Sequence, residues 1–312
     1  MDVSDPFADA LILTGPTGCG KTALALDLAE RLNAEVVSMD SMAVYRGLDI
    51  GTAKPTPTER ARVPHHLIDV LEPWEAGSVA WWLAQAAACC REIASRGKRV
   101  LIVGGTPMYL KALLRGLFEG PGANSALRLR LEDEARQVGT PAMHERLRHI
   151  DPATASRVHA NDLRRIVRAL EVFELTGQPI SAWQQQWSAS VSERNLAGHL
   201  EPRAVWLDLP RDKLYDRINR RVESMFAAGL VEEVRGLRGL ERPLSRQAAQ
   251  ALGYKEVFAY IEGAAGLEAT IEEVQMRSRN FAKRQMSWFR NLAEVHPLRQ
   301  ELTATLWAGK IQ

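Results

Sequence analysis

The chain has 312 residues, with 46% hydrophobic and 25% charged residues, which is ordinary for a soluble globular protein of one large domain with an insertion or of two domains. The net charge of +2 is close to neutral, so any binding of nucleic acid must come from local basic patches. Three cysteines outside any CxxC or Cys/His cluster argue against disulfides and zinc, and the absence of a signal pattern or a long apolar run favours a cytoplasmic protein without membrane contact.

The first third of the chain alternates apolar strands with amphipathic helices. The expected strands cover 10–15, 34–40 and 98–105, and the expected helices cover 21–32 and 79–95, the second capped by Ser78. This alternation predicts an α/β protein with a parallel sheet and helices on both faces.

From residue 119 to 199 the pattern becomes helical and charged, with no buried strand. We predict an inserted helical subdomain there, which divides the core domain into residues 1–118 and 200–312. The apolar run at 203–209 predicts a return to the sheet, and helices near 211–238, 245–262 and 268–293 are expected to complete the core.

Residues 15–22, GPTGCGKT, match the phosphate-binding pattern G-x-x-x-x-G-K-[ST] between a strand and a helix. The loop consists of Gly15, Pro16, Thr17, Gly18, Cys19, Gly20, Lys21 and Thr22. Backbone N–H groups, the helix N-terminus and Lys21 attract polyphosphate, and Thr22 can hold Mg²⁺. An ordinary glycine-rich turn is the alternative, and the matching flanks count against it.

Two further residues follow predicted strands. Asp40 ends the second strand, where ligands of a parallel sheet gather, and it can act as a general base or simply as a turn residue. Thr106 precedes Pro107, so it can be a helix N-cap, a ligand for a phosphate oxygen, or both. The strand before Thr106 ends in "GGT" without a carboxylate, which counts against a GTPase or motor and favours a transferase.

Basic residues cluster in three places. Arg164, Arg165 and Arg168 fall within two helical turns, and 276–290 carries five basic residues with three aromatic residues and no acid. Such stretches favour a surface for single-stranded RNA, although a solvated helix face is the plain alternative. Spacing of i, i+4 puts Arg217 and Arg221 on one helix face, where they could clamp a diphosphate or form surface salt bridges.

The motifs, taken together from residue 15 to 290, resemble the bacterial tRNA dimethylallyltransferase (isopentenyltransferase) family. The segments that carry the resemblance are GPTGCGKT, MDSMAVYRGLDIGTAKP, PHHLIDV, VGGTPMYLKALLRGL, DLRRIVRALEVFELTGQPIS, RINRRVESM with GLVEEV, QALGYKE and RSRNFAKRQMSWFR. The resemblance implies a P-loop NTPase-like core with an inserted helical, tRNA-binding subdomain. Pro107 stands where many members have Gly, and Met42 and Ala43 stand where Arg and Gln are frequent.

The implied reaction transfers a dimethylallyl group from dimethylallyl diphosphate to the N6 amine of adenosine 37, beside the tRNA anticodon. Asp40 would be the general base, Thr106 would orient the bridging oxygen, and Arg221 would contact the diphosphate near Lys21. The implied cofactor is Mg²⁺ at Thr22, and the implied state is a monomer. The implied tRNA contacts are Asp40, Ser41, Met42, Ala43, Arg164, Arg165, Ile166, Val167, Arg168, Arg246, Arg277, Lys283 and Arg284.

Three other functions share some of these features. An enzyme that prenylates free AMP or ATP would need the P-loop and the base but not the basic helices. A small-molecule kinase would use the same aspartate to activate a hydroxyl. An RNA-binding protein could use the P-loop only as a nucleotide switch.

Overall fold

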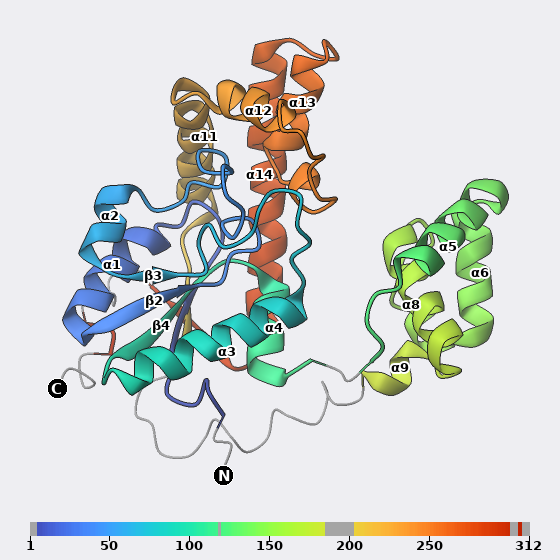
Figure 1. Cartoon of the computed structure of the whole chain (residues 1–312), viewed down its shortest axis with the longest axis horizontal. Helices are drawn as coiled ribbons and strands as arrows, with labels where there is room; N and C mark the ends of the chain where they lie inside the picture. The colour runs from blue at the N-terminus through green and yellow to red at the C-terminus, as the bar shows by residue number, and fades with distance from the viewer. Residues whose placement is uncertain (1–4, 118–119, 185–202, 300–304, 308–312) are drawn as a thin grey trace. The chain divides into compact units, whose positions relative to one another are not determined.

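The structure is a computed structural model, and it describes residues 5–117, 120–184, 203–299 and 305–307. The chain divides into two compact units, one formed by Met1–Leu114 with Gly198–Gln312 and the other by Arg115–Ala197. Figure 1 traces both units along the chain. In the part of the chain that the structure describes, no helix is long and apolar enough to cross a bilayer.

A six-stranded, all-parallel sheet forms the centre of the first unit, in the order β3-β2-β4-β1-β5-β6. Its strands are β1 (Leu11–Thr14), β2 (Ala34–Ser38), β3 (His65–His66), β4 (Arg99–Gly104), β5 (Ala204–Leu207) and β6 (Val295–Leu298). The prediction of an α/β core with a parallel sheet is confirmed. Two strands escaped the sequence patterns, because β3 has only two residues and β6 is a proline-containing edge strand.

Helices cover both faces of this sheet. The crossover from β1 to β2 and the one from β2 to β4 run in opposite directions along the sheet, so right-handed connections put α1 (Lys21–Leu32) and α3 (Val79–Ser95) on opposite faces. The cap predicted for α3 is confirmed, since Ser78 Oγ accepts a hydrogen bond from the Trp81 backbone N–H at 3.0 Å. Two further helices of this half are α2 (Pro57–Arg62) and α4 (Pro107–Arg115).

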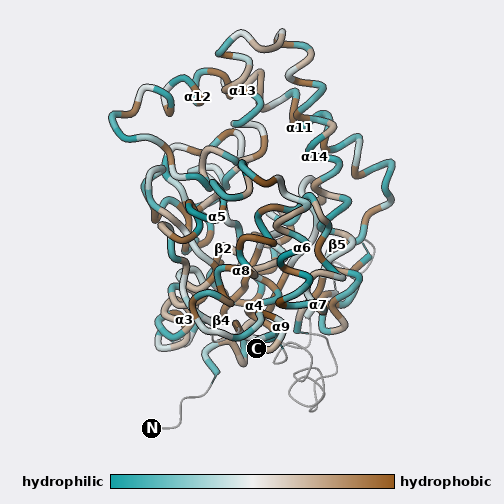
Figure 2. Tube along the Cα trace, turned by 90° about the vertical axis from the view of Figure 1, so that its right-hand side faces the viewer, coloured by the Kyte–Doolittle hydropathy of each residue, from teal (hydrophilic) through white to brown (hydrophobic). Residues whose placement is uncertain are grey.

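The second half of the unit contributes α11 (Arg211–Ala227), α12 (Leu230–Arg238), the 3₁₀ turn η1 (Ala248–Gln250), α13 (Tyr254–Ile261) and α14 (Leu267–Arg290). Gly229, with a φ of 100°, separates α11 from α12. Hydrophobic and hydrophilic residues alternate along α12 and α13 (Figure 2). The apolar residues of these two helices pack with the loop after β2 in a small second core, which supports that loop.

The ends of β2 and β4 meet closely beside the phosphate-binding loop. A Cβ atom on Gly104 would lie 2.1 Å from the Met39 carbonyl oxygen, so only glycine permits this approach. The Met39 N–H donates to Val103 O at 2.7 Å, and the Met39 carbonyl accepts from the Thr106 N–H at 3.3 Å. Asp40 and Thr106 therefore follow two strand ends that are locked together.

Trp82 of α3 holds the same region in place. Its side chain is fully buried, its Nε1 donates to Ser38 O at 2.9 Å, and its ring stacks on Tyr109 with the centroids 4.6 Å apart. One tryptophan of α3 thus holds both the end of β2 and the first turns of α4.

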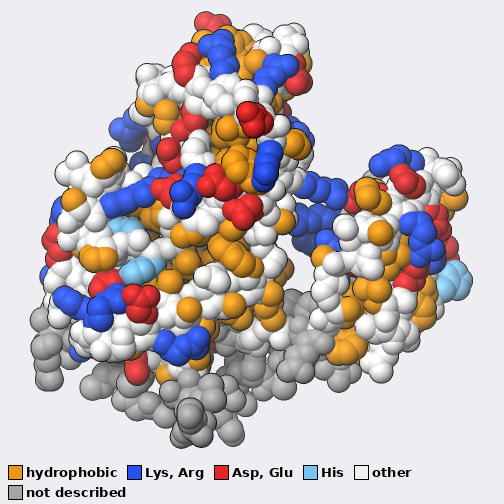
Figure 3. Space-filling model, in the orientation of Figure 1, with side chains coloured by type: hydrophobic (Ala, Val, Ile, Leu, Met, Phe, Trp, Pro, Cys, Tyr) orange, Lys and Arg blue, Asp and Glu red, His pale blue; other side chains and the backbone are white. Residues whose placement is uncertain are grey.

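The second unit is helical in its described residues, with α5 (Ser125–Val138), α6 (Thr140–Ile150), α7 (Pro152–Ala155), α8 (Leu163–Thr176) and α9 (Ile180–Trp183). It has its own hydrophobic core, which includes Leu131, Leu147, Ile166 and Leu170. The connections to the first unit, at 118–119 and 185–202, lie outside the described residues. Positive and negative side chains lie next to one another on the face drawn in Figure 3.

A buried carboxylate ties the helices of this unit together. Glu171 on α8 is fully buried, and it accepts hydrogen bonds from Arg128 Nε and Nη2 at 2.9 Å each, from Arg168 Nη1 at 2.6 Å and from the Asn124 N–H at 2.7 Å. Burial by itself would raise the pKa of Glu171, but the hydrogen bonds from Arg128, Arg168 and Asn124 outweigh it and hold the pKa below its usual value.

Replacement of Glu171 should loosen the second unit. In Glu171→Ala two arginines lose their shared acceptor, and we expect a loss of about 3–5 kcal/mol in the stability of this unit, measured by hydrogen exchange of its helices in the full chain. Because the folded pKa is lowered, the wild-type contribution is present above about pH 4.3, and it is lost as pH falls through the folded pKa. Asp133→Asn, at an exposed ion pair on α5, is the control and should cost less than about 1 kcal/mol. Equal protection in both variants would refute this role of Glu171.

Candidate active site

The phosphate-binding loop joins β1 to α1. Gly18 and Gly20 adopt left-handed backbone conformations, with φ of 79° and 95°, and Gly20 is the N-cap of α1. Lys21 Nζ donates to the carbonyl oxygens of Gly15 and Pro16, both at 2.9 Å, so the ammonium lies across the loop. The loop, the N-terminus of α1 and this lysine together form an environment that favours anions.

Two arginines of α11 reach this loop from one helix face, at the predicted i, i+4 spacing. Arg217 Nη1 donates to Cys19 O at 3.4 Å. Arg221 Nη1 donates to Thr17 Oγ1 at 3.4 Å, and its Nη2 donates to Thr52 O at 3.3 Å. Arg220, between them, is exposed and donates to its own helix instead.

Arg221 is unusual among the charged residues. Burial lowers the pKa of its guanidinium, and the nearby Asp40 and Cys19 act in the opposite direction. Its Nε is fully buried and has no hydrogen-bond partner among the described residues. A buried cationic donor with spare hydrogen-bonding capacity beside a phosphate-binding loop is suited to an anionic ligand.

Asp40 and Thr106 stand side by side after their two strands. Asp40 Oδ1 accepts hydrogen bonds from the N–H groups of Met42 at 2.8 Å and Ala43 at 3.2 Å, so the carboxylate also shapes the turn. Within the described residues Oδ2 accepts none. The Thr106 hydroxyl accepts from the Ser41 N–H at 3.0 Å and donates to Ser41 Oγ at 3.4 Å, which joins the two turns.

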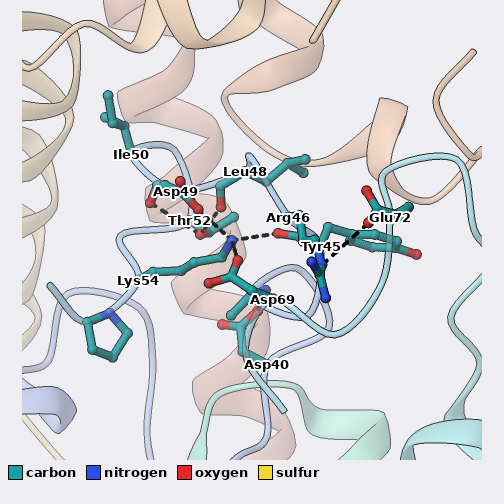
Figure 4. A network of polar contacts seen from close by, with 12 residues as sticks. Asp40, Tyr45, Arg46, Leu48, Asp49, Ile50, Thr52, Lys54, Asp69 and Glu72 are labelled. Carbon is teal, nitrogen blue, oxygen red and sulfur yellow. Dashed lines mark hydrogen bonds and ion pairs between the residues drawn. The ribbon is translucent and has the colours of Figure 1, made fainter. Parts of the chain in front are cut away.

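The polar loop that follows Asp40 is held by a buried lysine (Figure 4). The Lys54 side chain is only 3% exposed, and its Nζ donates to Tyr45 O at 2.5 Å, to Asp49 Oδ1 at 2.6 Å and to Asp69 Oδ1 at 2.5 Å. Burial would raise the pKa of Asp69, but hydrogen bonds from Lys54 and Arg60 hold it below its usual value. This lysine therefore closes the loop on itself.

Glu233 on α12 holds the tip of the same loop. Its carboxylate accepts from three consecutive backbone N–H groups, at distances of 3.1, 2.8 and 3.2 Å, and these belong to Asp49, Ile50 and Gly51. The Tyr254 hydroxyl donates to the same carboxylate at 2.5 Å. The next residue is Thr52, so this contact also sets the carbonyl that receives Arg221.

The sequence patterns did not single out Lys54, Glu233 or Gln285, although all three contact the backbone of the site. Gln285 on α14 accepts from the Thr17 N–H at 2.8 Å and donates to Gly105 O at 2.6 Å. An amide on an apolar helical stripe was the signal available for Gln285, because such a group needs partners inside the protein. Lys54 and Glu233 carried no such signal, because charged residues of this kind usually lie on the protein surface.

The predicted RNA-contacting residues of α8 differ in their exposure to solvent. Arg164 and Arg165 are exposed, whereas Ile166 and Val167 are buried in the core of the second unit. Arg168 is half-buried and binds Glu171 and the Pro121 carbonyl within that unit. Arg164 and Arg165 are therefore the members of this segment that are open to solvent.

The basic residues of α14 also differ in exposure and in their ion pairs. Lys283 and Arg284 are exposed, and so is Arg246 on the loop after α12. Arg277 is half-exposed and pairs with Glu273 at 2.8 Å and Glu256 at 3.3 Å, both acids from outside the stretch. Phe289 is fully buried and belongs to the core, which leaves it unable to stack on a base.

Thr22 lies on the first turn of α1 and is partly exposed next to Lys21. The described residues contain no group of three or more His, Cys, Asp or Glu side chains that could hold a metal ion. Mg²⁺ commonly takes only one or two protein oxygens and completes its shell with phosphate oxygens and water. A single hydroxyl at the phosphate-binding loop fits that donor set.

Two models of known protein families match the chain. The family model described as IPP transferase matches residues 43–292, and one described as isopentenyl transferase matches residues 8–69. A tRNA dimethylallyltransferase of Rhodopirellula baltica is 46% identical over 307 residues, covering 95% of this chain and 90% of the relative. One of Geobacter sulfurreducens is 47% identical over 280 residues, covering 90% of this chain and 88% of the relative.

Solved structures agree with these relatives. The tRNA isopentenylpyrophosphate transferase of Bacillus halodurans is 40% identical, covers 97% of both chains and superposes with a TM-score of 0.67. A eukaryotic dimethylallyltransferase acting on tRNA is 26% identical, covers 97% of this chain and 76% of that chain, and has a TM-score of 0.72. The predicted P-loop NTPase-like core is confirmed, and the chain belongs to the IPP transferase family.

Proposed function

We propose that the chain transfers a dimethylallyl group from dimethylallyl diphosphate to the N6 amine of adenosine 37 of tRNA, next to the anticodon. The observation that carries this proposal is the arrangement of Asp40 and Thr106 after adjacent strand ends, together with Arg221, at the phosphate-binding loop. Relatives that cover most of the chain bear names that match this reaction.

The adenine amine is a weak nucleophile, and its base must leave the stack to reach the electrophile. The N6 lone pair attacks the allylic carbon C1, the C1–O bond breaks, and diphosphate leaves with the bonding electron pair. Asp40 takes the proton from N6 as the C–N bond forms. The free Oδ2 of Asp40 supports this role, because the hydrogen bonds at Oδ1 fix the carboxylate and leave the second oxygen open.

The departing diphosphate gathers negative charge, which the cations beside the loop can stabilise. Lys21, Arg217 and Arg221 all contact the loop, and the buried Nε of Arg221 has room for one more acceptor. In this proposal, Thr106 orients the bridging oxygen of the diphosphate. When bound at Thr22, Mg²⁺ would neutralise further charge on the diphosphate oxygens.

A polynucleotide acceptor accounts for the exposed cations that a free nucleotide would not need. These are Arg164, Arg165, Arg246, Lys283 and Arg284. Each of these cations can pair with a phosphate of the RNA backbone. Ser41, Met42 and Ala43 directly follow Asp40, the proposed general base. We propose the anticodon stem-loop as the partner of these residues within each unit, and of Arg277 in the first unit. We also propose a cytoplasmic monomer.

The reaction is tested by incubating the chain with tRNA, dimethylallyl diphosphate and Mg²⁺, then digesting the tRNA and analysing its nucleosides by mass spectrometry. We expect an isopentenyl increment on an adenosine beside the anticodon. A parallel incubation with AMP in place of tRNA should give no product. Transfer to AMP with none to tRNA would overturn the proposed acceptor.

Asp40→Asn should lower kcat by roughly 10²–10⁴-fold, because the amide keeps the turn contacts at Oδ1 but cannot take a proton at neutral pH. The affinity for tRNA, measured by filter binding, should stay within about twofold of wild type, since one uncharged substitution leaves the exposed cations in place. Asp212→Asn, at an exposed acid in the first turn of α11, serves as the control. A kcat near the wild-type value in Asp40→Asn would remove this residue from the reaction.

Arg221→Lys should raise the KM for dimethylallyl diphosphate by about tenfold or more, because an ammonium cannot replace the guanidinium fork. The KM for tRNA should change little. Arg220→Lys, one position away on α11 and exposed, is the matched control. An unchanged KM for dimethylallyl diphosphate in Arg221→Lys would contradict the proposed contact.

A further inference from the structure

Gln285 connects two segments of the site that lie far apart in the sequence. Its Oε1 accepts from the Thr17 N–H at 2.8 Å, across 268 residues, and its Nε2 donates to Gly105 O at 2.6 Å, across 180 residues. The side chain is only 3% exposed. One amide thus holds the phosphate-binding loop and the β4–α4 turn at a fixed separation.

The surroundings of Gln285 on α14 are apolar. Ala282, Met286 and Phe289 are buried on the same side of the helix and belong to the main core. Burying an amide among such residues costs free energy unless both of its ends find partners. Helix packing alone would be served by an apolar side chain at this position, so the amide points to a task at its two partners.

Both partners of Gln285 are next to groups assigned to the diphosphate. The hydroxyl of Thr17 receives Arg221 Nη1 at 3.4 Å, and Gly105 immediately precedes Thr106. The packing leaves little slack, because a Cβ on Gly105 would lie 2.7 Å from Gln285 Nε2 and 3.0 Å from Gly15 O. A displacement of about 1 Å in such a site can lower the rate by about a hundredfold.

We propose that Gln285 is a positioning residue, which sets the phosphate-binding loop and the Thr106 turn around the diphosphate. This rests on the proposed function for its role in catalysis, whereas the binding of diphosphate itself can be tested separately. Gln285 touches the backbone of the loop and not the reacting atoms. Its loss should therefore act on diphosphate and leave tRNA recognition intact.

The test variant is Gln285→Met, which keeps the length of the side chain and removes both hydrogen bonds. Calorimetry with inorganic diphosphate and Mg²⁺, below the unfolding temperature, should show a Kd raised by about tenfold. Steady-state assays should show a similar rise in the KM for dimethylallyl diphosphate, with the KM for tRNA within about twofold of wild type.

The matched control is Gln275→Met on the same helix. Gln275 Nε2 donates to Asn219 O at 3.4 Å and Glu223 Oε1 at 3.1 Å, away from the phosphate-binding loop. This variant should bind diphosphate within about twofold of wild type. Gln285→Glu is the second variant, in case the Met variant does not fold: it keeps an acceptor for Thr17 but loses the donor to Gly105, so it should also weaken diphosphate binding.

A diphosphate Kd within about twofold of wild type in Gln285→Met or, where that variant is unfolded, in Gln285→Glu would overturn the proposal. Equal rises in the KM values for tRNA and dimethylallyl diphosphate would overturn it too, because they indicate general damage. If the wild-type chain gave no prenylated tRNA, the proposed function would fail, while the calorimetric comparison would still decide the role of Gln285.

Discussion

The guanidinium of Arg221, whose Nε is fully buried, is the constraint around which the site is organised. A cation can be kept out of water only if acceptors or negative charge surround it, and its acceptors come from two separate segments, Thr17 of the phosphate-binding loop and Thr52 of the loop after β2. Asp40 adds a compensating charge. Thr17, Thr52 and Asp40 must therefore each be held in place by other residues.

The supporting contacts come from outside the site. Glu233 fixes the loop tip just before Thr52, and Lys54 closes that loop with three further hydrogen bonds (Figure 4). Gln285 holds Thr17, and the approach of Gly104 to Met39 places Asp40 beside Thr106. A rigid frame of this kind lowers the reorganisation needed when charge develops on a leaving group.

The arginines of the second unit show why a basic run cannot be equated with a binding surface. Arg168 stabilises the buried carboxylate of Glu171, while Arg164 and Arg165, on the same helix, face solvent. The three residues look alike in the sequence because they are arginines that lie only a few positions apart. Their partners are decided by the packing of α8 on α5, where Arg128 shares the same carboxylate.

Patterns in the amino-acid sequence were sufficient to predict the phosphate-binding loop, the parallel α/β core and the shared face of Arg217 and Arg221. These features depend on local spacing, such as the G-x-x-x-x-G-K-[ST] pattern and the i, i+4 interval, and local spacing is visible in one dimension. The cap at Ser78 was predicted for the same reason. The strands β3 and β6 were not, since one is too short and the other too irregular to carry an alternating pattern.

The contacts between segments that lie far apart in the chain could be seen only in the folded protein. Gln285 reaches Thr17 across 268 residues, and Glu233 reaches Ile50 across 183, so no local pattern could connect them. The same holds for Gly104, where only glycine fits because Met39, at the end of the neighbouring strand, lies so close. Contacts between distant segments depend on how the strands are ordered in the sheet, and that order emerges only when the whole core packs.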